Sequence, residues 1–186
     1  LEVHPVDLEA ADGAIRVRGV PGKSVTYVQV ATAAFKPVAE ISGRGVAPQH
    51  QATPYGAQFA EVEVNVRTGQ VRVLRLVAAH DVGRAINPLI VEGQIEGGAA
   101  QGIGYALTED MPVDADGQPL AASFMDYRVL TASDVPLIES VVIEAPDPAG
   151  PFGAKGVGEV GIIPTAAAIA NAIYDAVGVR LTELPM

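Results

Sequence analysis

Two alternating segments joined by a short turn constrain the fold of this chain more than any other part of its sequence. Residues 59–66 alternate apolar and polar side chains strictly from Glu61 onward, and residues 71–77 alternate again in their first half. Between them, residues 67–70 contain Gly69, a residue that hairpin turns favour. A period of two places every second side chain on the same face. The segment is therefore predicted to be a β-hairpin whose charged face is solvated and whose valine- and leucine-rich face packs on another element.

A helix is expected soon after the hairpin. Asn87 precedes Pro88, which is the favoured order for an N-cap residue and a first helical position, and a helix over residues 88–108 is predicted. Each glycine inside a helix costs about 1 kcal/mol relative to alanine. Such a helix is expected where its backbone must approach another backbone or a ligand closely. The small residues in question are Gly93, Gly97, Gly98, Ala99, Ala100, Gly102 and Gly104.

The remaining elements are expected to be short. Strands are predicted at residues 14–18, 123–129 and 140–144. Residues 25–35 fit a helix or a strand, with a spacing that favours a helix, and a second helix over about 163–176 should end at Gly178. Residues 42–56 and 114–118 have loop and turn compositions. Together these elements predict an α+β chain of mixed helices and small β-sheets.

The absence of cysteine limits what the chain can do by itself. None of the 186 residues is a cysteine, so disulfides, thiolate zinc sites and cysteine-ligated iron–sulfur clusters are excluded. Redox work would need a non-protein cofactor and a partner that carries electrons. The net charge of −10 argues against nucleic acid and anionic membranes as partners. No apolar stretch approaches the roughly 18 residues of a membrane span, and no export signal is visible, so the cytoplasm is the expected location.

A glycine-rich loop precedes the second predicted helix. Its glycines, Gly153, Gly156 and Gly158, leave backbone N–H groups bare near a helix N-terminus, an arrangement that can bind phosphate. The loop lacks the residues of a Walker motif around Lys155, and its spacing reverses the dinucleotide fingerprint. Spacing alone therefore leaves open a non-catalytic phosphate- or nucleotide-binding module, or a structural subunit, that uses the Gly153–Gly158 loop.

Glu159 follows this loop and has two explanations. It can interact with the dipole and the free N–H groups of the helix that follows. Alternatively, an apolar pocket would bury the carboxylate and make it a stronger general base. That pocket would be formed by Phe152, Val157, Val160 and Ile162.

Two glutamines and a histidine–aspartate pair are further candidates. Gln94 and Gln101 are seven residues apart and share a face of the predicted helix, where their amides could read the edge of a heterocycle or simply face water. The glycine-bearing helix and the Gly153–Gly158 loop are expected to close as two walls on one extended, polar ligand. His80 and Asp81 are neighbours at a strand end, so their side chains are expected to point apart and to be structural.

Several long motifs resemble the molybdenum-binding large subunit of the xanthine dehydrogenase/aldehyde oxidase family. The resemblance covers most of residues 55–186, and the motifs occur in the family's order, which makes it specific. The motifs are Ala79-His80-Asp81-Val82-Gly83-Arg84-Ala85-Ile86-Asn87-Pro88, the glycines and glutamines of 93–102, the segment 150–159, and the tail from Ile169 to Pro185.

The resemblance implies a role for each matching residue. Glu159 matches the family's catalytic glutamate, which takes a proton from the molybdenum-bound hydroxyl as that oxygen attacks an electron-poor carbon of an aldehyde or N-heterocycle. No residue of this chain is expected to ligate the metal, and Lys155 is expected to contact the cofactor through its backbone only. The implied cofactor-binding residues are Gln94, Gly97, Gly98 and Gln101 of the helix and Ala154, Lys155, Gly156, Val157 and Gly158 of the loop.

The resemblance also implies what this chain lacks. Large subunits of the family are several times longer, and their first cofactor-binding half, with its Gly-Gly-Phe-Gly loop, is not found here. Residues 1–186 are therefore expected to be the C-terminal portion of a molybdopterin-binding domain, inactive without its partner half. The implied cofactor is molybdopterin with molybdenum, in the cytosine dinucleotide form. The implied partners are the remaining part of the molybdenum subunit, an iron–sulfur subunit, optionally an FAD subunit, and a small-molecule substrate whose identity stays open.

Overall fold

The computed structural model describes residues 1–34 and 52–186. The chain forms two compact units, Leu1–Ala47 and Pro48–Met186. Phe35, at the end of the segment predicted as helix or strand, and most of the predicted loop 42–56 lie outside the described residues.

The first unit is a small antiparallel sheet followed by one helix. Its strands lie in the order β1-β2-β3, and the predicted strand at 14–18 is confirmed as β2. Residues 24–34 contain both structures that their sequence allows, because a short strand leads directly into a helix. The elements are η1 (Pro5–Asp7), β1 (Leu8–Ala11), β2 (Ala14–Val17), β3 (Ser24–Thr26) and α1 (Tyr27–Ala34).

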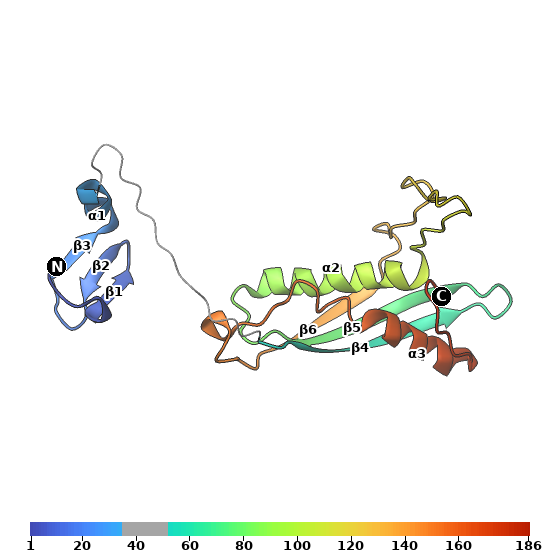
Figure 1. Ribbon diagram of the computed structural model, residues 1–186. Coiled ribbons are helices and arrows are strands. Elements are labelled where there is room, and N and C mark those ends of the chain that lie inside the picture. The colour runs from blue at the N-terminus through green and yellow to red at the C-terminus, as the bar shows by residue number, and fades with distance from the viewer. Residues whose placement is uncertain (35–51) are drawn as a thin grey trace. The chain divides into compact units, whose positions relative to one another are not determined.

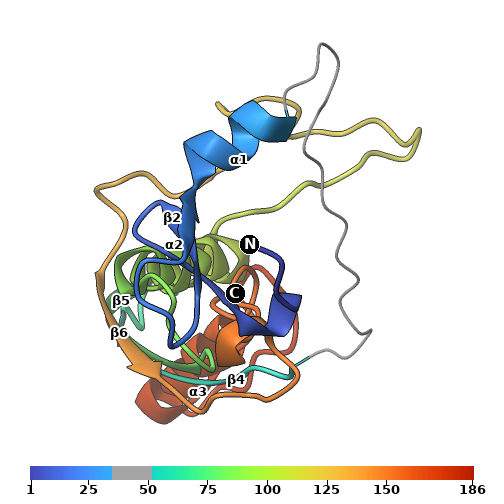
Figure 2. The same ribbon diagram turned by 90° about the vertical axis from the view of Figure 1, so that its left-hand side faces the viewer.

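The second unit is a three-stranded sheet with helices α2 and α3 packed on it (Figures 1 and 2). Strands β4 and β5 form the predicted antiparallel hairpin, and β6 lies parallel to β5 on its other side. Helix α2 lies between β5 and β6 in the chain and makes the crossover that a parallel pair requires. The elements are β4 (Tyr55–Val64), β5 (Val71–Asp81), α2 (Pro88–Leu107), β6 (Leu137–Ile143), η2 (Pro151–Gly153) and α3 (Thr165–Val177).

A bulge in β5 keeps the inner face of the hairpin continuous. Glu61 pairs with Arg75 while Val62 pairs with Val73, so Leu74 is an extra residue. Without it, the side chains after Leu74 would face the opposite side of the sheet. The bulge explains why the alternation in the sequence stops halfway along the second strand.

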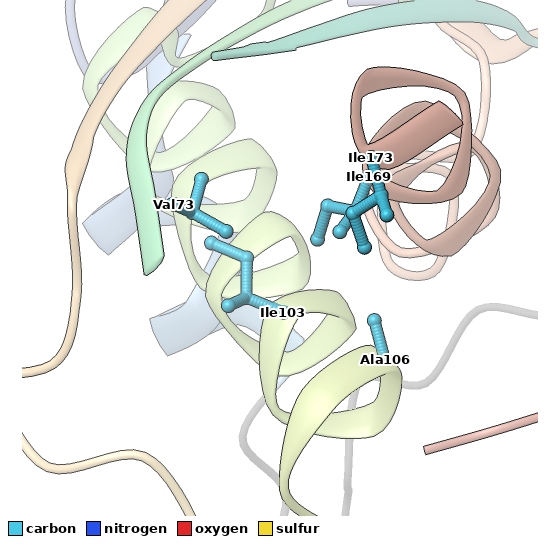
Figure 3. Packing of buried hydrophobic residues seen from close by; sticks show 5 residues of the cluster. All are labelled: Val73, Ile103, Ala106, Ile169 and Ile173. Carbon is cyan, nitrogen blue, oxygen red and sulfur yellow. The ribbon is translucent and has the colours of Figure 1, made fainter. Parts of the chain in front are cut away.

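Two buried clusters attach the helices to the sheet. In the larger one, Val73 of β5 meets residues of α2 and α3, and all five side chains converge in Figure 3: Val73, Ile103, Ala106, Ile169 and Ile173. The smaller cluster joins the end of β5 to the first half of α2 through Ala78, Val82, Val91 and Ile95. Full burial of a large aliphatic side chain stabilises a fold by about 1.5–3 kcal/mol. The clusters therefore fix both halves of α2 on the sheet.

Local signals in the sequence account for the ends of both helices. The Oδ1 atom of Asn87 accepts a hydrogen bond from the N–H of Ile90 at 3.3 Å, which confirms the predicted cap. Gly178 ends α3 with a φ of 73°, a left-handed conformation that glycine adopts readily. The predicted strand at 140–144 is confirmed within β6. Within the described part of the chain, every helix falls short of the length or apolar character that a bilayer span needs.

The predicted strand at 123–129 is wrong. The N–H groups of Asp126 and Tyr127 both donate to the carbonyl of Ser123, and the Ser123 hydroxyl donates to the Asp126 carboxylate at 3.0 Å. These local bonds offer the backbone a turn in place of a strand. Phe124, an apolar residue of this segment that a packed strand would bury, is 87% exposed.

Replacing Ile169 by alanine tests the role of the larger cluster. Ile169 is fully buried, so Ile169→Ala should lower the free energy of unfolding by about 2–5 kcal/mol in urea denaturation. Ile163 is 73% exposed, so the matched change Ile163→Ala should alter it by less than about 0.5 kcal/mol. Equal effects of the two changes would contradict this core assignment.

Candidate functional site

The glycine loop after η2 is joined to the end of β5 by backbone hydrogen bonds. The N–H of Lys155 donates to the carbonyl of Val82 at 2.8 Å, and the N–H of Arg84 donates to the carbonyl of Gly153 at 3.0 Å. Gly83 must be glycine here, because it has a φ of 68° and a Cβ atom would lie 2.3 Å from the Gly153 oxygen. The loop is thus placed beside the residues that lead into α2.

A buried ion pair reinforces this junction. The Nζ atom of Lys155 lies 2.6 Å from Oδ2 of Asp81, and their side chains are only 7% and 13% exposed. The other Asp81 oxygen accepts hydrogen bonds from the N–H groups of Gly83 and Ala145. Burial alone would raise the pKa of Asp81, but the hydrogen bonds from Lys155, Gly83 and Ala145 and the lysine charge outweigh it and hold that pKa below its usual value. The Lys155 side chain and its backbone N–H are therefore both engaged within the chain, which leaves its carbonyl for other contacts.

The turn that follows Glu159 lies directly on α2. A Cβ atom on Gly98 would be 3.0 Å from the Gly161 backbone, and one on Gly161 would be 3.0 Å from the Ile95 oxygen. The N–H of Ile162 donates to the carbonyl of Glu159 at 3.2 Å and closes the turn. Gly98 is the place where the helix backbone meets another backbone. The contact is made by the turn that follows the Gly153–Gly158 loop, and the closing of the loop and the helix on one ligand stays a prediction.

Four other glycines of these two walls have no such neighbour. At Gly93, Gly97, Gly156 and Gly158, no described atom lies within 4 Å of the place where a Cβ would be. None of them has a positive φ, so their backbone conformation does not require glycine. A helix gains about 1 kcal/mol from alanine at such positions. This open backbone surface fits a group outside the described residues that approaches closely.

Glu159 and the two glutamines are exposed. The predicted apolar pocket around Glu159 is not formed by this chain: Val160 is buried, but Phe152 is 83% exposed and Glu159 itself is at the surface. Phe152 adopts a φ of 56°, a left-handed conformation that an extended loop does not have. Gln94 and Gln101 share one exposed strip of α2 with Gly97, as their spacing predicted.

A buried polar cluster lies against the turn that follows Glu159, and no local sequence motif predicts it. The Gln58 Nε2 group donates to the carbonyl of Gly161 at 2.7 Å and lies 3.2 Å from Nε2 of His80. The Thr165 hydroxyl donates to Oε1 of Gln58 at 2.7 Å. Gln58 and His80 occupy inward positions of β4 and β5. A polar residue among otherwise apolar inward positions is the sequence signal that could have indicated this cluster.

His80 is a neutral, structural member of this cluster. It is fully buried, and burial lowers its pKa. Because Gln58 Nε2 donates to its Nε2, the ring proton sits on Nδ1, which has no partner among the described residues. Nδ1 faces Gly56, where a Cβ atom would be only 2.3 Å away. His80 and Asp81 turn to different partners, as expected for neighbours on a strand.

Comparison of the sequence with known proteins identifies similar chains. Residues 1–136 match the family described as the molybdopterin cofactor-binding domain. The chain is 41% identical to the gamma subunit of the 6-hydroxypseudooxynicotine dehydrogenase complex of Paenarthrobacter nicotinovorans, over 100% of this chain and 25% of that protein. It is 36% identical to the carbon monoxide dehydrogenase large chain of Afipia carboxidovorans, over 95% of this chain and 22% of that protein.

Solved structures show the same similarity. Quinoline 2-oxidoreductase from Pseudomonas putida 86 superimposes with a TM-score of 0.79 at 34% identity, over 97% of this chain and 24% of that one. The Cu,Mo-CO dehydrogenase superimposes with a TM-score of 0.76 at 35% identity, over 96% of this chain and 23% of that one. The chain thus spans about a quarter of the length of these relatives, with covered shares from 22% to 25%.

The buried His80 should make the fold sensitive to mild acid. In the unfolded chain His80 binds a proton below its usual pKa of 6.5, whereas the folded protein binds it only at a lower pH. The stabilisation from the neutral His80 is therefore full above the unfolded pKa of 6.5. It is lost progressively as the pH falls from there through the lower pKa of the folded protein. Urea unfolding at about pH 7.5 and about pH 5.0 should show the loss, and His80→Gln should reduce the difference between the two pH values. An unchanged difference in the variant would exclude His80 as its source.

Proposed function

Because this chain belongs to the molybdopterin cofactor-binding domains of the xanthine dehydrogenase/aldehyde oxidase family, we propose that it forms part of the cofactor site of a molybdenum hydroxylase. In this proposal, residues 1–186 are the C-terminal portion of the molybdopterin-binding domain. The other cofactor-binding half comes from the remaining part of the molybdenum subunit, and without it the chain does not turn over. The substrate class is an aldehyde or an N-heterocycle.

The observation that carries this proposal is the open backbone of the two walls next to Glu159. Gly97, Gly156 and Gly158 have no neighbour among the described residues that explains them, and the turn that follows the loop packs on the helix where Gly161 meets Gly98. A cofactor seated there would contact bare backbone and exposed amides. The residues that would hold it are Gln94, Gly97, Gly98 and Gln101 of α2 and Ala154, Lys155, Gly156, Val157 and Gly158 of the loop.

The bound molybdenum cofactor supplies a redox centre that accepts the two electrons released when a water-derived oxygen is added to the substrate. The role of this chain is to orient the cofactor and to accept the proton that the water-derived oxygen loses. The N–H groups of Gly156, Val157 and Gly158 would donate hydrogen bonds to the cofactor, since those of Ala154 and Lys155 already donate within the chain. The amides of Gln94 and Gln101 can both donate and accept them. Glu159 accepts the proton on a carboxylate oxygen as general base. The Asp81–Lys155 pair keeps the loop backbone in position for these contacts.

Electrons must leave through other subunits in this proposal. The chain contains no cysteine to ligate an iron–sulfur cluster. We therefore assign the clusters to a separate subunit, and assign FAD, where the assembly uses it, to another. The cofactor form proposed is the cytosine dinucleotide.

Replacing Glu159 by glutamine tests the catalytic assignment. Glu159→Gln keeps the size of the side chain but removes the base, so kcat of the complete enzyme should fall by about 10²–10⁴-fold. Molybdenum content, measured by mass spectrometry, should stay unchanged because the side chain is exposed and its removal disturbs no packing. The control Glu63→Gln, on an exposed position of β4, should keep full turnover. Near-normal turnover of Glu159→Gln would remove Glu159 from the mechanism.

Replacing Gly97 by alanine separates cofactor contact from folding. With open space around this position, Gly97→Ala should stabilise the purified chain by up to about 1 kcal/mol in urea unfolding. If the cofactor lies against Gly97, the same change should lower the molybdenum content of the assembled enzyme. Gly93→Ala is the matched control, since it is equally open but is not assigned to the cofactor. Full molybdenum loading in both variants would contradict the assignment of Gly97.

A further inference from the structure

The position of Glu159 is not set by contacts of its own side chain. The carboxylate is exposed and makes no hydrogen bond to any described residue. Its place therefore depends on the backbone of the turn 159–162. Among the described residues, the backbone bond that closes this turn runs from the N–H of Ile162 to the carbonyl of Glu159. The attachment of the turn to the rest of the unit therefore decides where the carboxylate lies.

The turn is held between α2 and two buried side chains, because the Gly161 carbonyl lies within hydrogen-bond distance of both the Gln58 amide and, at 3.2 Å, the Thr165 hydroxyl. On one side, Gly161 packs against the backbone of α2 at Gly98. On the other side, the Gln58 amide accepts the Thr165 hydroxyl and donates to the Gly161 carbonyl, each at 2.7 Å. Gln58 is 9% exposed and Thr165 is fully buried, so no water competes for these bonds. A single side chain of β4 thus ties both the turn and the first residue of α3 to the sheet.

We propose that Gln58 is a positioning residue for Glu159, whose amide holds the 159–162 turn in the place from which the carboxylate accepts its proton. The inference rests on the proposed role of Glu159 as general base. Gln58 does not touch the substrate or the cofactor in this account. It acts only through the backbone of the turn.

Only an amide side chain at position 58 can form hydrogen bonds with all three of its partners. The two N–H hydrogens of Gln58 serve the Gly161 carbonyl and Nε2 of His80, and its oxygen serves the Thr165 hydroxyl. A carboxylate could not donate to the carbonyl, and an apolar side chain could serve none of the three. An inward glutamine in an otherwise apolar row costs desolvation, which the three bonds offset. In this proposal, the buried glutamine serves to hold the 159–162 turn in place.

Hydrogen exchange tests the inference without a substrate. Gln58→Met keeps the length of the side chain but removes the amide. In the complete enzyme, amide exchange of residues 159–165 should become about tenfold faster or more, while residues 91–106 of α2 and 76–80 of β5 stay within about twofold. Unchanged exchange in the turn would overturn the proposal. A uniform rise across α2 and β5 would also overturn it, because that is what a purely structural role produces.

Turnover then links the turn to Glu159. On whichever of quinoline or benzaldehyde the wild-type complex oxidises, Gln58→Met should lower kcat about 10–100-fold per bound molybdenum with KM within about twofold. In the Glu159→Gln background the same change should have no further effect, since the two residues act as one unit. Equal losses in both backgrounds would overturn the proposal. Full activity of Glu159→Gln alone would instead overturn the proposed function on which it rests.

Thr165 provides a second variant should Gln58→Met fail to fold. Thr165→Val removes the hydroxyl that donates to Gln58 at 2.7 Å and lies 3.2 Å from the Gly161 carbonyl, whereas Thr165→Ser keeps it. The valine variant should show the faster exchange in the turn and the lower kcat, and the serine variant should restore both. Identical behaviour of the two variants would contradict the proposed role of the Gln58 amide.

Discussion

The close contact between the backbones of Gly98 and Gly161 is the interaction on which the candidate site depends. It allows the turn after Glu159 to lie on α2, and any side chain at either glycine would push the two apart. The hydrophobic clusters hold α2 on the sheet. The contact with α2 therefore also fixes the position of the turn relative to the sheet. Open glycines on the same helix and loop then present bare backbone outward. In the proposed function, core packing and cofactor contact therefore use neighbouring positions of one glycine-rich helix.

Buried polar groups add to the packing that holds the glycine loop and the turn after Glu159 in place. The Asp81–Lys155 pair and the backbone bonds beside it fix the glycine loop at the end of β5. The amide of Gln58 fixes the turn from the side of β4. An exposed carboxylate in an otherwise rigid setting suits a group that must meet a cofactor supplied from outside the chain.

Local patterns were enough to predict the hairpin, the capped helix α2 and the end of α3. Their signals lie within a few residues of the structure they specify, as with Asn87 and Gly178. The bulge at Leu74 and the turn at Ser123 depend on competition between local bonds and sheet pairing, which alternation alone does not reveal. The Gln58 cluster joins residues that are 103 and 107 positions apart. Such contacts appear only once β4, β5 and α3 have been brought together. The apolar pocket offered as one explanation of Glu159 is not formed for the same reason, because neighbours in sequence were taken for neighbours in space.

The central claim is that the two walls of this chain form part of a molybdopterin site. The most direct measurement is the molybdenum and nucleotide content of the complex that purifies with this chain. The account predicts molybdenum in about equimolar ratio to the chain, together with a pterin dinucleotide. A complex that binds nucleotide but contains no molybdenum would contradict it.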